Sequence, residues 1–179
     1  FGLSKRMAAL VEEEESVKAL TEPLMVRRLA KLLMLSKDQR LNVVKLNELK
    51  KSFGFPEDYV LRIVTKYSDI FRVVNCSGRQ SSMEIELLRW DQDLAVSAIE
   101  SVAMERGAEP QFSCSLPLSW IKTREKFLDF NARSPYISPY VKDCTNSELD
   151  SEKRYVGMVH ELLSLTLWKK ASILKLEHF

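Results

Sequence analysis

Histidine and cysteine, the side chains most often used for catalysis and metal binding, are scarce in this 179-residue chain. Of the two histidines, His160 precedes a glutamate, but the residue four positions later is Ser164, so the HExxH zinc motif is absent. We therefore expect His160 on a helix surface. The three cysteines are far apart and not near histidines in metal-ligand spacing, which argues against a disulfide framework or a zinc site and favours a reducing compartment.

Other catalytic patterns are missing as well. The five glycines form no phosphate-binding loop, and no GxSxG nucleophile motif occurs. Asp91 and Asp93 suit a turn and a helix cap better than an acid–base pair. The sequence predicts no enzyme, no cofactor and no metal.

Basic side chains are the stronger signal. Residues 27–66 contain ten Lys or Arg against four Asp or Glu, whereas residues 67–119 contain four against eight. A locally basic segment suits an anionic partner such as a phosphate backbone, although a plain solvated charge is the favoured interpretation of each residue taken alone. From charge placement, the candidate contacts are Lys50, Lys51, Arg62, Lys66, Arg79, Lys169 and Lys170.

Two tyrosines in a Pro-Tyr repeat are candidates for stacking on bases. Tyr136 and Tyr140 each follow a proline in the segment SPYISPY. Prolines make such a segment stiff and non-helical, so packing of the connector against the core competes with the stacking interpretation.

Three short helices are predicted in the basic segment. Pro23 suits a helix start, and leucines follow it at helical spacing. A second helix is predicted over 43–52, ended by Gly54, and a third begins after Pro56. The third helix would present Arg62 and Lys66 one turn apart.

Two strands follow, over 71–74 and 83–87, joined by a polar loop. Three helices and a hairpin are the plan of a winged-helix module. The predicted fold class is therefore α+β, mainly helical, with a winged-helix-like first module.

The rest of the chain mixes helices with a connector. We expect a helix over 94–106 between a cap at Asp93 and Gly107, a strand over 112–116 and a helix over 120–131. A last helix, capped near Ser147, Asp150 or Ser151, should bury one face. That face contains Tyr155, Met158, Val159, Leu162 and Leu163.

A shift of 130 residues aligns 29–49 with 159–179 without a gap, with five identities. The simplest interpretation is a second copy of the first module's opening helices, and we expect the chain to be a piece cut inside that copy. The predicted organisation is a flank (1–22), a first module (23–90), a middle region (91–133), a Pro-Tyr connector (134–150) and the start of a second module (151–179). No apolar run reaches membrane-spanning length, so no membrane partner is expected.

Several blocks resemble the plant organelle RNA recognition (PORR) domain, in which residues 23–179 would together form part of one domain. The blocks are Phe53–Tyr59 (FGFPEDY), Tyr67–Val73 (YSDIFRV), Glu86–Asp91 (ELLRWD), Leu94–Val96 (LAV), Ser134–Tyr140 (SPYISPY) and Glu152–Thr166 (EKRYVGMVHELLSLT).

This resemblance implies an RNA-binding protein of plant mitochondria or chloroplasts. Such factors bind group II intron RNA and promote splicing together with other proteins, without catalysing the reaction. Any targeting peptide would precede Phe1. Two other interpretations stay open: a DNA-binding winged-helix regulator, and a protein-interaction scaffold in an organellar ribonucleoprotein.

Overall fold

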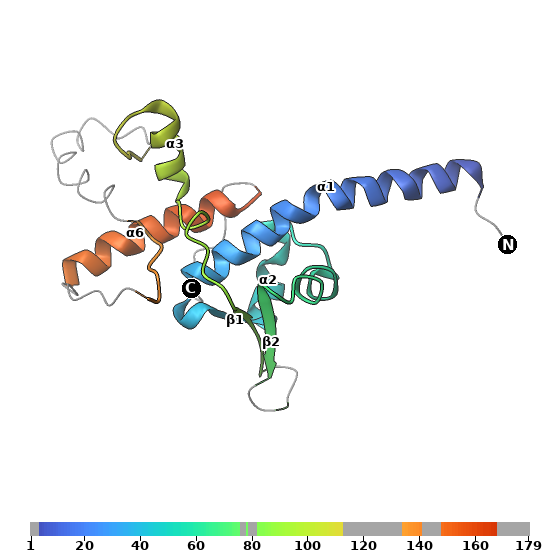
Figure 1. Ribbon diagram of the computed structural model, residues 1–179, viewed down its shortest axis with the longest axis horizontal. Helices are drawn as coiled ribbons and strands as arrows, with labels where there is room; N and C mark the ends of the chain where they lie inside the picture. The colour runs from blue at the N-terminus through green and yellow to red at the C-terminus, as the bar shows by residue number, and fades with distance from the viewer. Residues whose placement is uncertain (1–3, 76–77, 79–81, 113–133, 141–147, 168–179) are drawn as a thin grey trace.

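The computed structural model describes residues 4–75, 78, 82–112, 134–140 and 148–167. Helices predominate, and a three-stranded antiparallel sheet lies against them (Figure 1). The predicted fold class, α+β and mainly helical, is confirmed.

The longest element is helix α1 (Lys5–Leu35), which begins after Ser4, whose hydroxyl accepts a hydrogen bond from the Met7 N–H at 3.3 Å. Pro23 lies inside this helix, so the prediction that the helix starts there is wrong. Proline removes only one hydrogen bond from a helix that is held by packing at its C-terminal end, where every residue over 29–35 is buried.

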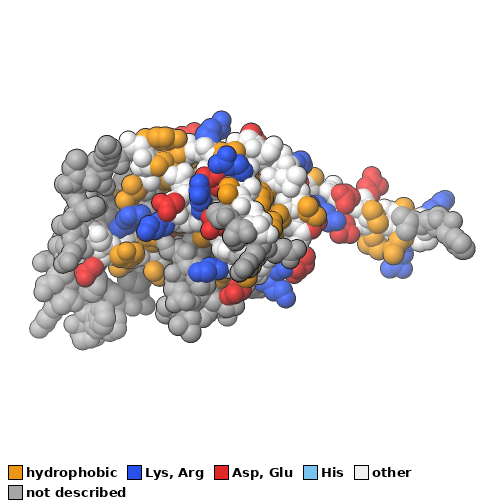
Figure 2. All heavy atoms as spheres, turned by 90° about the horizontal axis from the view of Figure 1, so that it is seen from below, with side chains coloured by type: hydrophobic (Ala, Val, Ile, Leu, Met, Phe, Trp, Pro, Cys, Tyr) orange, Lys and Arg blue, Asp and Glu red, His pale blue; other side chains and the backbone are white. Residues whose placement is uncertain are grey.

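The N-terminal half of α1 projects from the body of the molecule (Figure 1). Hydrophobic side chains share its surface with charged ones of both signs (Figure 2). Met7, Leu10 and Val11 are about half exposed there.

A short strand and a second helix follow α1. Strand β1 (Arg40–Asn42) leads into α2 (Val43–Phe53), and the Asn42 side chain caps the helix by accepting from the Val44 N–H at 2.9 Å. Gly54 ends α2 in the left-handed conformation, with φ +75°. The predicted helix and its glycine stop are confirmed.

The third helix predicted after Pro56 is a single π-helical turn, η2 (Val60–Val64). Its Ile63 and Val64 are buried, as the apolar spacing predicts. Because this element is so short, the winged-helix description stays a prediction.

The predicted hairpin is confirmed as β2 (Phe71–Asn75) and β3 (Met83–Leu87), and the sheet order is β1-β3-β2. Strand β1 was not predicted, because three residues are too few for an alternating pattern. Ile85 at the centre of the sheet is fully buried. On the other face Glu86 lies opposite a residue of each outer strand.

Helix α3 (Ala98–Arg106) starts later than predicted. Ser97 caps it in a capping box with Glu100, so the predicted cap at Asp93 is wrong, whereas the stop at Gly107 is confirmed. The Asp91 carboxylate instead accepts from the Asp93 N–H at 3.0 Å, which confirms a turn there. The strand and helix expected over 112–116 and 120–131 lie almost wholly outside the described residues.

Helix α6 (Glu148–Leu165) follows the connector, as predicted, but its inward face is only partly the predicted one. Tyr155 and Val159 are 64% and 45% exposed, whereas Met158, Leu162 and the charged Glu161 are buried. Leu163 also packs against the core, so three of the five predicted inward residues are confirmed. The inward face is rotated from the predicted one toward Glu161, which forms a polar contact with α1.

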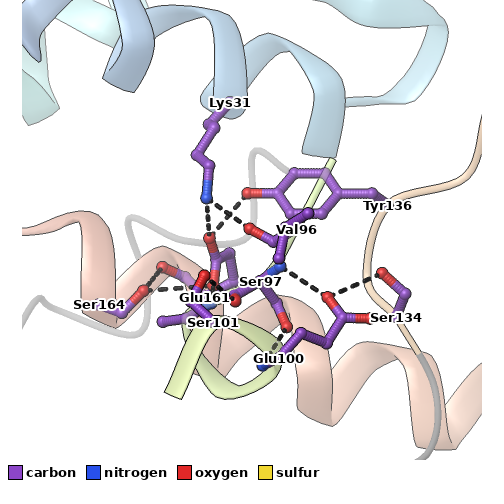
Figure 3. A network of polar contacts seen from close by, with 10 residues as sticks. Lys31, Val96, Ser97, Glu100, Ser101, Ser134, Tyr136, Glu161 and Ser164 are labelled. Atoms are coloured by element: carbon purple, nitrogen blue, oxygen red, sulfur yellow. Dashed lines mark hydrogen bonds and ion pairs between the residues drawn. The ribbon is translucent and has the colours of Figure 1, made fainter. Parts of the chain in front are cut away.

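That contact joins Lys31 of α1 to Glu161 of α6, two positions that are 130 residues apart and thus equivalent in the repeat. Their side chains form a buried ion pair at 3.0 Å (Figure 3). The Lys31 ammonium also donates to the Val96 carbonyl at 2.7 Å, and the Glu161 carboxylate accepts from the Ala98 N–H at 2.7 Å. We call this group, with Tyr136, the repeat junction. Helices α1 and α6 also end 130 residues apart, at Leu35 and Leu165, and the repeat stays a prediction.

Candidate functional site

The two adjacent lysines at the end of α2 are placed differently. Lys50 pairs with Glu57, which holds the pKa of that carboxyl below its usual value. Lys51 is exposed, and within the described residues it has no ion-pair partner. Lys51 is therefore the better placed of the two to meet a phosphate.

Arg62 and Lys66 differ in the same way. The Arg62 guanidinium lies 4.0 Å from the Asp58 carboxylate, the outer limit of an ion pair. Lys66 pairs closely with Glu22 of α1, which also accepts from the Tyr67 hydroxyl at 2.8 Å. The hydrogen bond from Lys66, together with that from Tyr67, lowers the pKa of Glu22 below its usual value.

Lys51 and Arg62 meet at a groove between α1 and the segment that runs from the end of α2 to η2. The groove has a volume of about 380 Å³ and is open to solvent. Its lining residues are Lys18, Thr21, Glu22, Met25, Lys51, Gly54, Phe55, Pro56, Arg62 and Ile63. We call it the α1–α2 groove. Three cations and one carboxylate stand around an apolar floor.

The residues that α1 contributes to this groove were not predicted from the sequence. Lys18, Thr21, Glu22 and Met25 fall on one face of a helix by their spacing, but that pattern runs through Pro23, where the helix was predicted to start. Lys18 is itself held by Glu14 at 2.7 Å and by the following glutamate at 3.2 Å. Helical periodicity continued through the proline would have revealed these residues.

The two candidate stacking tyrosines have opposite environments. Tyr136 is only 7% exposed, and its hydroxyl donates to Glu161 at 2.8 Å in the repeat junction. Burial, with the adjacent Glu161, raises the pKa of Tyr136 well above its usual value. The stacking hypothesis is wrong for this placement of Tyr136, because its ring is packed in the core. Tyr140 is 78% exposed, so stacking on a base stays a prediction for this residue.

The remaining predicted contacts, Arg79, Lys169 and Lys170, lie outside the described residues.

A pair of arginines on the open face of the sheet was not predicted. Glu86 of β3 accepts from Arg40 of β1 at 2.7 and 3.1 Å and from Arg72 of β2 at 2.8 Å. These hydrogen bonds, first that of Arg40 and then that of Arg72, lower the pKa of Glu86. The signal was missed because it needs β1, which pairs with β3 from 46 residues away.

His160 lies on helix α6, as expected, but its side chain is partly buried and its ring meets Phe112 edge-on at 5.1 Å. Within the residues that the structure describes, no cluster of His, Cys, Asp or Glu has three members placed to bind a metal. None of the described helices has the length and apolar character needed to span a membrane.

The fold and this basic groove belong to a chain whose whole length, residues 1–179, matches the model of the plant organelle RNA recognition domain. The chain is a member of that family. Residues 1–22, expected to be a flank, fall inside the matched range.

Relatives of the chain include proteins named as chloroplastic or mitochondrial. The chain is 34% identical to protein WHAT'S THIS FACTOR 1 homolog, chloroplastic, of Oryza sativa subsp. japonica, over 100% of the chain and 38% of the relative. It is 27% identical to protein WHAT'S THIS FACTOR 9, mitochondrial, of Arabidopsis thaliana, over 98% and 48%. Protein ROOT PRIMORDIUM DEFECTIVE 1 of the same plant is 30% identical over 86% and 42%.

The chain thus spans less than half the length of each of these relatives. No solved structure matches it. The family and the compartments named for its relatives support an organellar, RNA-related role.

Proposed function

We propose that this chain binds RNA in a plant organelle and promotes group II intron splicing as a factor without catalytic activity of its own. The observation that carries the proposal is the α1–α2 groove in a member of an RNA recognition family. It brings two of the residues picked from charge placement, Lys51 and Arg62, to one rim.

Binding would act through the phosphate backbone. Cations that neutralise phosphates release condensed counterions, so affinity falls as salt rises. Lys51 has no ion-pair partner in the described part of the chain, and Arg62 is only loosely paired, so neither must give up a strong interaction to meet RNA. A folded scaffold with such a rim can hold an intron segment in place without cutting it.

The DNA-binding alternative is less well supported. A recognition helix must fill the major groove with several exposed side chains. The five-residue turn η2, which occupies the corresponding place, is too short to do so, and two of its residues are buried.

The protein-scaffold alternative has one observation in its favour, the exposed apolar side chains on the projecting half of α1. Such side chains suit protein partners in a ribonucleoprotein.

Competition binding of single-stranded RNA, duplex RNA and duplex DNA at one physiological ionic strength tests RNA binding. We expect single-stranded RNA to compete best, and equal or better competition by duplex DNA would contradict the proposal. The double variant Lys51→Ala, Arg62→Ala should weaken RNA binding and reduce its logarithmic salt slope by about 1.4, or about 0.7 for each phosphate that is no longer neutralised. Lys45→Ala, an exposed lysine on the same helix α2, is the matched control.

The splicing part needs a test in the organelle. RNA that co-precipitates with the protein should be enriched in unspliced group II intron transcripts. Enrichment of other RNA alone would leave RNA binding standing and remove the splicing role.

A further inference from the structure

We propose that the α1–α2 groove receives a single unpaired RNA base, while Lys51 and Arg62 hold the phosphates on either side of it. This inference rests on the proposed RNA binding and adds the form of RNA that is bound.

The size of the groove sets the first limit. About 380 Å³ is near the lower end of the range for small-ligand pockets, roughly 300–1,000 Å³. It suits one planar ring system and not a stack of several. The groove is also open on one side, so a base can enter while its ribose and phosphates stay at the rim.

The chemistry of the lining residues sets the second limit on what the groove can bind. Met25 and Pro56, both partly exposed, give the floor apolar atoms on which the face of a base can lie, and the buried Phe55 and Ile63 complete the apolar lining. The half-buried Arg62 adds a planar guanidinium, which stacks on bases as well as pairing with phosphate. Thr21 and Glu22 on the α1 wall offer polar atoms to base edges.

The charges around the groove favour a nucleotide over an apolar peptide side chain. Of the three cations in the lining, Lys18 is paired with two glutamates and Arg62 is loosely paired with Asp58 at 4.0 Å. Lys51 has no ion-pair partner among the described residues, and the one carboxylate in the lining, Glu22, is paired with Lys66. An anionic backbone would therefore be attracted to the rim at the place where the base enters.

Pairing excludes duplex RNA from this site. In an A-form helix the bases are stacked and paired, and moving one out costs a few kcal/mol, whereas in loops and single strands the bases are already free. The groove would thus select unpaired intron segments and hold them apart from competing base pairing.

The test fills the groove without changing its charge. Thr21→Trp places an indole in the space of the base, and Leu20→Trp adds the same ring at the next position of α1, where the side chain is 80% exposed and outside the groove. The probes are oligouridine of about eight nucleotides and the same backbone with abasic ribose throughout. A perfectly paired RNA duplex is the third probe.

We expect the wild-type chain and Leu20→Trp to bind oligouridine about tenfold more tightly than the abasic backbone. Thr21→Trp should reduce that ratio to below about twofold and leave duplex affinity unchanged. The double variant Lys51→Ala, Arg62→Ala, which leaves the apolar floor in place, should instead weaken both oligomers by a similar factor.

If the ratio of oligouridine to abasic affinity were the same in the wild type and in Thr21→Trp, the proposal that the groove binds a base would be contradicted. RNA binding itself would still stand. Failure of the wild-type chain to bind any RNA would overturn the proposed function together with it. Should Thr21→Trp not fold, the charge variant decides: loss of oligouridine affinity without loss of abasic affinity would contradict phosphate binding at the rim.

Discussion

The same three residue types form the same contacts at two places in this molecule. In the repeat junction Lys31 pairs with Glu161, Tyr136 donates to that glutamate at 2.8 Å, and the ammonium lies 5.4 Å from the centre of the tyrosine ring. Beside the α1–α2 groove a second lysine, glutamate and tyrosine repeat this arrangement, again with a 2.8 Å hydrogen bond and with 5.7 Å between ammonium and ring. We call Lys66, Glu22 and Tyr67 the surface triad.

Burial is the difference between them. The side chains of Lys31 and Glu161 are 11% and 1% exposed, whereas in the surface triad Glu22 is 12% exposed but Lys66 is 61% exposed. A buried charge that loses its partner stays without compensation, but an exposed one is taken up by water. Identical contacts thus hold the fold together in one place and leave a cation exchangeable in the other.

The largest expected effect is on the stability of the repeat junction. Glu161→Ala should lower the free energy of unfolding by about 3–5 kcal/mol, because Lys31 is left buried without its carboxylate. Urea denaturation measures the change. Glu152→Ala, an exposed glutamate on the same helix α6, should be close to neutral. Equal effects of the two substitutions would show that burial does not set the strength of the junction.

The next largest effect is the difference in stability between tyrosine substitutions in the repeat junction and in the surface triad. Tyr136→Phe removes a buried hydroxyl that donates to a carboxylate, and we expect a loss of about 1.5–3 kcal/mol in the free energy of unfolding. Tyr67→Phe makes the same chemical change in the surface triad and should cost clearly less, since water can replace the missing donor. A larger loss for Tyr67→Phe would reverse the comparison.

The smallest effect is the pH response of the surface triad. Lys66 and Tyr67 lower the pKa of Glu22, so this carboxylate adds stability above the usual glutamate pKa, about 4.3, and loses it as the pH falls through its own lowered pKa. The difference in unfolding free energy between the wild type and Glu22→Gln should shrink as the pH falls below about 4. Glu48→Gln, exposed on α2, is the control and should not follow this trend. High salt at neutral pH should also reduce the difference.

Local features of this fold were predictable from the sequence. The spacing of apolar residues gave α2, and Gly54 gave its end, because a left-handed stop is a local property of glycine. The strand patterns in 71–74 and 83–87 predicted the hairpin in the same way. Lys51 and Arg62 were picked from charge alone and do lie at one groove.

The failures come from contacts between distant parts of the chain. Pro23 argued for a helix start, but packing at the far end of α1 carries the helix through it. For Tyr136, packing against the core was preferred to stacking and is what the structure shows, but nothing nearby in the sequence indicates that its hydroxyl donates to Glu161. The shift of 130 residues placed Lys31 beside Glu161 in an alignment, yet alignment cannot show that two equivalent residues touch.

The Lys31–Glu161 pair has a consequence for how such a junction can be built. When two identical copies of a module meet about a two-fold axis, a residue on the axis meets itself. Lysine would then face lysine, or glutamate would face glutamate, in the most buried place of the interface. Only when both copies belong to one chain can the two positions mutate separately, so that one becomes a cation and the other an anion. In the predicted tandem repeat, the Lys31–Glu161 pair would thus be a contact that two identical subunits could not form on their axis.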